Sequence, residues 1–216
     1  MAHASLYRVG GNALLIGAVL FAAAILLHAP QPTDLTTYGT LPMGPWMAAH
    51  WLFAVGAVCI AGGLFALARH LFTTDGEGWA VLGVGATIVT ASLFVAIVAP
   101  EIAAFPLLNQ MNVGETSVGA QHAFTAVNLN LLSLVQVAGP LFWLGIVCYG
   151  LAMLRGAASP RWLAQVGIAV GIAEILAAFT LGERWMVFKL VFVLGCGWLA
   201  LAGNALARMS PARASS

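Results

Sequence analysis

Three histidines and one glutamate lie beside long apolar stretches, where the ends of helices would bring their side chains together. They stand next to four successive stretches: His28, His50, Glu101 and His122. Imidazole nitrogens and carboxylate oxygens are the usual ligands of zinc, iron and copper in proteins. The four residues therefore predict a site for a transition-metal ion, or for haem iron held by axial histidines, in a redox or electron-transfer role.

The spacing along the chain does not itself form a ligand motif, because no two of these histidines have HxxxH or HExxH spacing. The site must be assembled by the packing of separate helices. For haem, His50 and His122 are the pair expected to face each other across the interior. Met43, Met47 and Met111 belong to the same side, and thioether sulfur beside imidazole favours copper. The alternative is that these side chains only occupy the half-polar interface of a membrane.

A second pair of ionisable residues lies deeper in the apolar stretches. Glu174 and Lys189 are at comparable distances from a turn at Gly182-Glu183, which makes their stretches antiparallel neighbours. We expect them to form an intramembrane ion pair, since pairing reduces the cost of removing two charges from water. The functional alternative is a relay for protons or a small solute.

Composition decides where such sites can exist. The chain has 216 residues, of which 62% are hydrophobic and 7% charged, and its mean hydropathy is +0.98. Soluble domains carry about 25% charged residues, so this chain cannot cover a water-exposed surface. A net charge of +1 with no basic cluster excludes a nucleic-acid partner. The lipid bilayer is the expected surrounding.

The chain is long enough for six membrane-spanning helices in a single domain covering residues 1–216. A span needs about 20 largely apolar residues, and Pro or Gly stands near most of the expected ends. The fold class is therefore an all-α polytopic bundle. The expected spans are 10–29, 46–69, 79–100, 126–154, 162–181 and 185–207, followed by a tail at 209–216.

The distribution of Arg predicts the orientation. With the N-terminus inside, the cytoplasmic side holds Arg8, Arg69, Arg155, Arg161, Arg208 and Arg213, and the outer side holds Arg184. The positive-inside rule then places both termini in the cytoplasm and the His/Glu cluster at the outer face. A cleaved signal peptide at residues 1–30 is the alternative, but its apolar run is long and lacks a small-x-small cleavage site.

Small residues indicate where helices pack closely. Gly167 and Gly171 form a GxxxG motif in the fifth span, as expected for helix packing in lipid. The cysteines are expected to be inert packing residues. Because the chain has no phosphate-binding loop, dinucleotide fingerprint, nucleophile elbow or HExxH motif, the common mechanisms of ATP-driven work and hydrolysis are disfavoured.

The stretch from Gly145 to Gly171 contains Arg155, followed by Ser-Pro-Arg-Trp-Leu at 159–163. It resembles the fourth-to-fifth helix hairpin of small bacterial six-helix membrane proteins of unknown function. Ala164 replaces a Gly of that pattern. The resemblance covers about an eighth of the chain, implies the same topology in a bacterial cytoplasmic membrane, and transfers no activity or site residue.

Three functions remain open from the sequence. The first is a metal- or haem-binding membrane protein with a redox partner or a larger membrane complex. The second is an accessory or sensory subunit without chemistry of its own. The third is a small solute or proton-coupled transporter that uses Glu174 and Lys189. Oligomeric state and catalytic activity remain undetermined.

Overall fold

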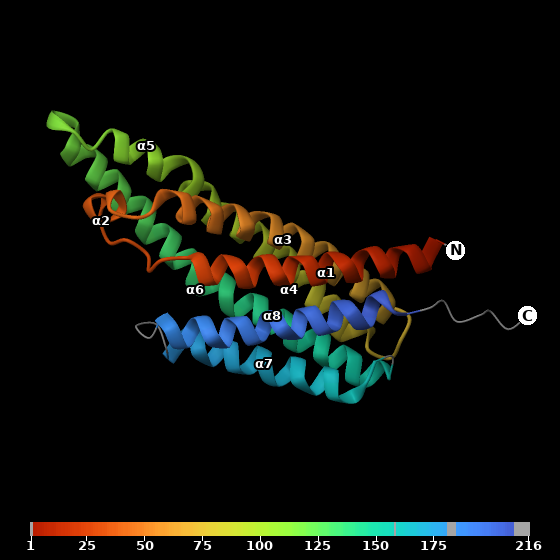
Figure 1. The fold of residues 1–216 in the computed structure, drawn as a ribbon. Coiled ribbons are helices and arrows are strands. Elements are labelled where there is room, and N and C mark those ends of the chain that lie inside the picture. Colours follow the sequence, from red (N-terminus) through yellow and green to blue (C-terminus); the bar gives the residue numbers. More distant parts are fainter. Residues whose placement is uncertain (1, 158, 181–184, 210–216) are drawn as a thin grey trace, which may run out of the picture.

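The computed structural model describes residues 2–157, 159–180 and 185–209, in which every regular element is a helix (Figure 1). The expected all-α class is confirmed. The elements are α1 (Ala2–Leu27), α2 (Leu35–Gly39), α3 (Met43–Leu71), α4 (Glu77–Ala99), the π-helix η1 (Pro100–Ala104), α5 (Phe105–Gln110), the 3-10 helix η2 (Gly114–Thr116), α6 (Ser117–Gly156), α7 (Arg161–Thr180) and α8 (Trp185–Ala207).

Six helical segments are long and apolar enough to span a membrane, as the hydropathy predicts. Two are longer than predicted by more than ten residues: the third runs over Glu77–Gln110 and the fourth over Gly114–Gly156. Pro100 does not end the third span because the chain continues there as a π-helix, in which Phe105 N–H donates to the Pro100 carbonyl. Membrane helices tolerate proline where local π adjustments satisfy the freed backbone groups again.

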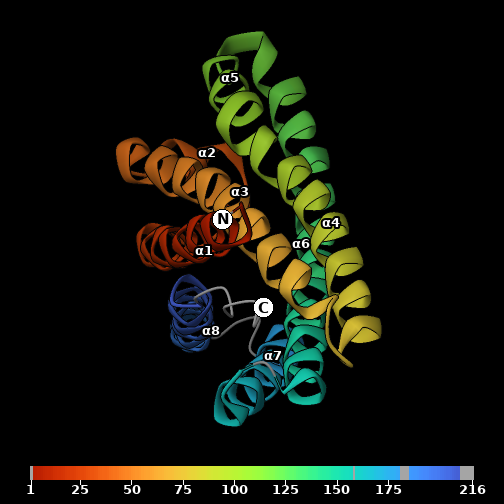
Figure 2. The same ribbon diagram turned by 90° about the vertical axis from the view of Figure 1, so that its right-hand side faces the viewer.

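The six spans form a closed ring, visible end-on in Figure 2. Each span packs mainly against two others, in the order α1, α8, α7, α6, α4, α3 and back to α1. Apolar side chains cover the outside of this ring, for example Val58 and Val95, which are 73% and 69% exposed. An apolar outer surface of this kind is suited to contact with lipid, and together with the six long helices it indicates a multi-pass membrane protein.

Four phenylalanines fill the middle of the ring, and we call them the aromatic layer: Phe21, Phe53, Phe94 and Phe192. Phe21 of α1 stacks on Phe94 of α4 and on Phe192 of α8, with ring centroids 5.3 and 6.0 Å apart. Phe53 of α3 lies edge-on to Phe21 at 5.3 Å. Since α4 and α8 are not neighbours in the ring, side chains that connect them through Phe21 must lie in its interior.

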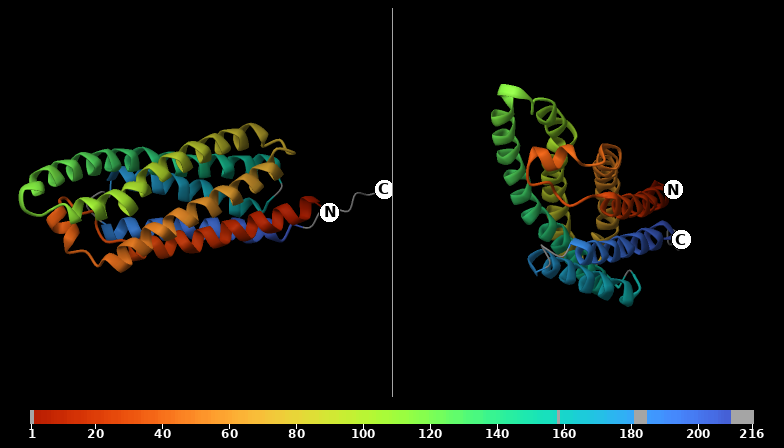
Figure 3. Two further views of the ribbon diagram at one scale, coloured as in Figure 1. Left: turned by 90° about the horizontal axis from the view of Figure 1, so that it is seen from above. Right: turned by 60° about the vertical axis from the view of Figure 1, so that its left-hand side comes forward.

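The bundle has two distinct ends. The start of α1 and the end of α8 lie together at one of them, where Gly11 contacts Ala207. The opposite end, called the distal end, carries α2 and the turn between α5 and α6, which projects beyond the other helices (Figure 3). The expected turn at 182–183 and most of the expected tail, residues 210–216, lie outside the described residues.

Glycines allow the closest helix contacts. A side chain at Gly63 of α3 would lie 2.5 Å from Leu14 Cβ of α1, so the two backbones touch. Gly167 of the expected GxxxG pair lies against Trp198 of α8, whereas Gly171 lies against the Trp143 carbonyl of α6. The two glycines therefore pack against different helices, one on each side of α7.

Candidate functional site

The structure brings three of the four predicted ligand residues together at the distal end. His28 directly follows α1, His50 is in α3, and Glu101 is in η1; their side chains come from three different spans. The imidazole centroids of His28 and His50 are 4.9 Å apart, and His50 Nε2 lies 3.8 Å from Glu101 Oε2. All three are buried, with 9%, 3% and 1% of their surface exposed. We call these three residues the distal site.

The π-helix gives Glu101 its position. A π-turn adds one residue to a helical turn and commonly occurs at functional sites. Pro100 promotes it, since proline has no N–H to continue the regular α-helical pattern. The carboxylate is thereby placed inside the bundle, with one oxygen accepting a hydrogen bond from Gln31 Nε2 at 2.6 Å.

The backbone of α3 determines which nitrogen of His50 is available. His50 Nδ1 lies 2.8 Å from the Trp46 carbonyl oxygen, which can only accept a hydrogen bond, so Nδ1 carries the proton. In the neutral ring, Nε2 then presents a lone pair toward Glu101 Oε2, an oxygen that has no hydrogen-bonding partner in the structure. The two atoms face each other 3.8 Å apart, and a proton or a metal ion between them would satisfy both.

Two amide side chains hold the carboxylate in place. Gln31 Nε2 also donates to Asn128 Oδ1 at 3.0 Å, and Asn128 Nδ2 donates to the Pro32 carbonyl at 3.0 Å. Gln31 was not among the predicted site residues, although its position between Pro30 and Pro32, just after His28, is a usable signal. These bonds join the connection after α1 to α6 and to Glu101.

Aromatic rings enclose the two histidines. Trp46 is 4.7 Å from both imidazoles by ring centroid, and Phe53 of the aromatic layer is 5.9 Å from His28. Burial, together with His50 and Lys189, lowers the pKa of His28 to about 4, so its imidazole is neutral. Burial and the charge of Glu101 raise the pKa of Tyr38 to about 12. The imidazole of His28 is therefore neutral and packed against the rings of Trp46 and Phe53.

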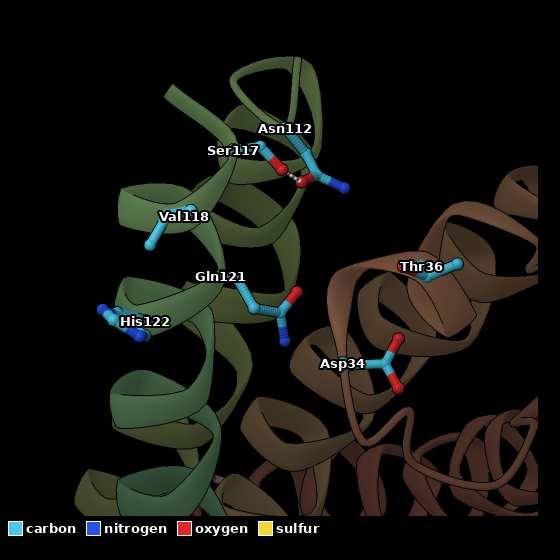
Figure 4. Close-up of a pocket in the computed structure, with 7 residues that line it drawn as sticks. All are labelled: Asp34, Thr36, Asn112, Ser117, Val118, Gln121 and His122. Carbon is cyan, nitrogen blue, oxygen red and sulfur yellow. Dashed lines mark hydrogen bonds between the residues drawn. The ribbon is translucent and has the colours of Figure 1, made fainter. Parts of the chain in front are cut away.

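His122 does not join the other three residues. It is exposed on α6 and lines a separate surface pocket of about 370 Å³. Figure 4 shows its ring pointing away from Asp34, on the far side of Gln121. The His50 and His122 pair expected for haem is therefore not formed, and the contact between His28 and His50 leaves no space for a porphyrin between them.

The expected ion pair between Glu174 and Lys189 is not formed either. Lys189 Nζ donates to the carbonyl oxygens of His28 and Leu26, at 2.7 and 3.3 Å, and thereby caps the end of α1. Glu174 is fully buried, and neither carboxyl oxygen has a hydrogen-bonding partner. The two residues match in depth, but Lys189 is directed toward α1, which packs beside α8.

Among the described residues, no three His, Cys, Asp or Glu side chains stand ready to surround a metal ion. What the distal site offers is two facing donor atoms, His50 Nε2 and Glu101 Oε2, with a second imidazole beside them. No family model, curated protein sequence or solved structure matches the chain.

Proposed function

We propose that this membrane protein binds a first-row transition-metal ion at the distal site and uses it in a redox or electron-transfer role. The observation that carries the proposal is the 3.8 Å approach of His50 Nε2 to Glu101 Oε2, with no hydrogen-bonding partner on that oxygen. A cation between the two atoms satisfies both. Imidazole with carboxylate suits iron, copper and zinc, and of these copper and iron support electron transfer.

Gln31 and Trp46 support this role through the ligands. Residues that hydrogen-bond the outer side of a metal ligand fix its orientation and its protonation. The Trp46 carbonyl does so for His50, and Gln31 does so for Glu101. Both ligands are thus oriented before an ion arrives, which reduces the entropic cost of binding.

The proposed orientation places the distal site at the outer face of a bacterial cytoplasmic membrane. The opposite end carries the arginines: Arg8, Arg69, Arg155, Arg161 and Arg208. By the positive-inside rule that end belongs in the cytoplasm. A redox partner, or another subunit of a larger membrane complex, would then approach α2 and the turn between α5 and α6 from outside.

Metal loading of the purified protein tests the proposal. The protein is prepared in detergent without chelators, incubated separately with copper, iron and zinc salts, desalted and subjected to elemental analysis. We expect stoichiometric retention of one of the three metals, and loss of that metal in Glu101→Gln and His50→Ala. Glu101→Gln is the gentler change, because its amide oxygen still accepts from Gln31.

His122→Ala is the matched control. It removes an imidazole from the same end of the bundle, but from an exposed position outside the distal site. The control should retain as much metal as the unmodified protein. A folded, metal-free protein, or equal metal retention in all variants, would refute the proposal and leave a structural or accessory role for the distal site.

A further inference from the structure

A second buried acid lies deeper in the bundle, on the other side of the aromatic layer. Along α8, Lys189 is followed by Phe192 and then Gly195, each about 4.5 Å further along the helix axis. Lys189 reaches the distal end, Phe192 belongs to the aromatic layer, and Gly195 contacts Glu174. The order along the bundle axis is therefore distal site, aromatic layer, Glu174.

The aromatic layer lies between Glu174 and the distal site. Phe21 and Phe94 precede His28 and Glu101 by seven residues each, which is about 10 Å of helix rise. Phe192 also meets Trp143 of α6, with ring centroids 5.9 Å apart, so the layer reaches the opposite side of the ring. The described surroundings of Glu174 come from α6 and α8 and include no residue of the distal site.

Glu174 occupies a space that α6 and α8 leave for it. A side chain at Gly195 would lie 2.9 Å from Glu174 Oε1 and 2.2 Å from Trp143 Cη2. The carboxyl group therefore lies between the indole of Trp143 and the backbone of α8, and its residue is 0% exposed. The thiol of Cys196, also on α8, is close enough to interact with a charge on the Glu174 carboxyl group.

No described group compensates a negative charge at this position. Both Glu174 oxygens lack a hydrogen-bonding partner, and the ion pair recorded among the described residues is the one between His50 and Glu101. Lys189 donates to carbonyl groups at the distal end instead. An ionised carboxylate in such surroundings costs several kcal/mol, which binding of a proton removes.

We propose that Glu174 is an intramembrane proton-binding site that exchanges its proton with solvent. An isolated intramembrane carboxyl is characteristic of proton relays. The chemistry requires only that the carboxyl group releases its proton and takes it up again. This adds a proton-coupled step to the protein, on the side of the aromatic layer that faces the termini.

Infrared spectroscopy of the protein in lipid tests this directly. A protonated carboxyl has a carbonyl band separate from those of carboxylates and amides, and the band shifts in D2O when the proton exchanges. We expect such a band at neutral pH, shifted in D2O and absent in Glu174→Gln. Glu115→Gln, which changes an exposed acid at the distal turn, should leave it intact.

Two results would overturn the proposal: a spectrum of folded Glu174→Gln that retains every protonated carboxyl band, or a Glu174 band that is unmoved by D2O. The metal content of Glu174→Gln separates this outcome from that of the proposed function, because the aromatic layer lies between the sites. Glu174→Gln should retain metal like the unmodified protein. Thermal unfolding of Glu174→Gln shows, independently of metal content, whether this variant is folded.

Discussion

Two adjacent glycines of α3 provide a sharp test of the packing that positions the distal site. Gly63 is buried, and an added Cβ would lie 2.5 Å from Leu14 Cβ and 2.8 Å from the Gly10 carbonyl oxygen. Gly62 is exposed, and an added Cβ there would meet nothing within 4 Å. Both are in the interior of the same helix, so the intrinsic helical gain from Gly to Ala is the same for both, about 1 kcal/mol.

The contact distances set the difference between the two substitutions. Carbon atoms prefer separations of about 3.5–4.0 Å, so Gly63→Ala forces α1 and α3 apart by about 1 Å. Overpacking of this kind costs about 1–3 kcal/mol, and the upper end applies because backbone atoms of Gly10 and Leu14 are in the way. After the helical gain, we expect Gly63→Ala to destabilise by about 2 kcal/mol and Gly62→Ala to stabilise by about 1 kcal/mol.

Thermal unfolding in detergent, followed with a thiol-reactive dye, measures both variants. Cys148 and Cys196 are buried and become reactive when the bundle opens. For a chain of this size, 1 kcal/mol corresponds to about 2–4 °C in Tm, so Gly63→Ala should unfold about 4–8 °C below the unmodified protein. If Gly63→Ala matched or exceeded the Tm of Gly62→Ala, the close approach of α1 and α3 would be refuted.

Two further predictions concern the polar groups of the distal end. Lys189→Met removes the cation that caps α1 through the carbonyls of Leu26 and His28; hydrogen bonds to charged groups contribute about 1.5–3 kcal/mol, and an unchanged Tm would contradict the cap. Asp34 accepts from Thr37 N–H at the start of α2, which holds the pKa of this carboxyl below its usual range. The cap is therefore present above that pKa and is lost as the pH falls through it. Amide hydrogen exchange in α2, corrected for the intrinsic rate, should become faster below this pH. Constant protection of α2 amides across this pH range would contradict the cap.

The number of spans follows from hydropathy, but two boundaries do not. A long apolar run can only be satisfied by a lipid-exposed helix, so the six spans are visible in the sequence. Pro100 indicates a helix end by the usual rules, yet a π-turn satisfies the backbone and the helix continues. Whether the helix ends at Pro100 or continues through a π-turn depends on how the neighbouring helices pack. The residues of this one stretch do not contain that information.

The distal site was predictable in outline because helix ends on one side of a bundle converge. The rotation of each helix was not. In α6 the buried residues Ala120, Phe124, Asn128 and Leu131 form one stripe, and His122 lies two positions from Ala120 and Phe124, on the opposite face. For Lys189, the choice between Glu174 and the end of α1 depends on α8 packing beside α1, a contact between the first and last spans.

The metal content of Glu101→Gln, compared with that of the control His122→Ala, decides whether the distal site binds a metal ion. The unmodified protein, Glu101→Gln and His122→Ala are loaded side by side and quantified per folded chain. We expect stoichiometric metal in the unmodified protein and in His122→Ala, and none in Glu101→Gln, because the Glu101 carboxylate faces Nε2 of His50. Metal that persists in Glu101→Gln, or a folded unmodified protein that retains none, would contradict it.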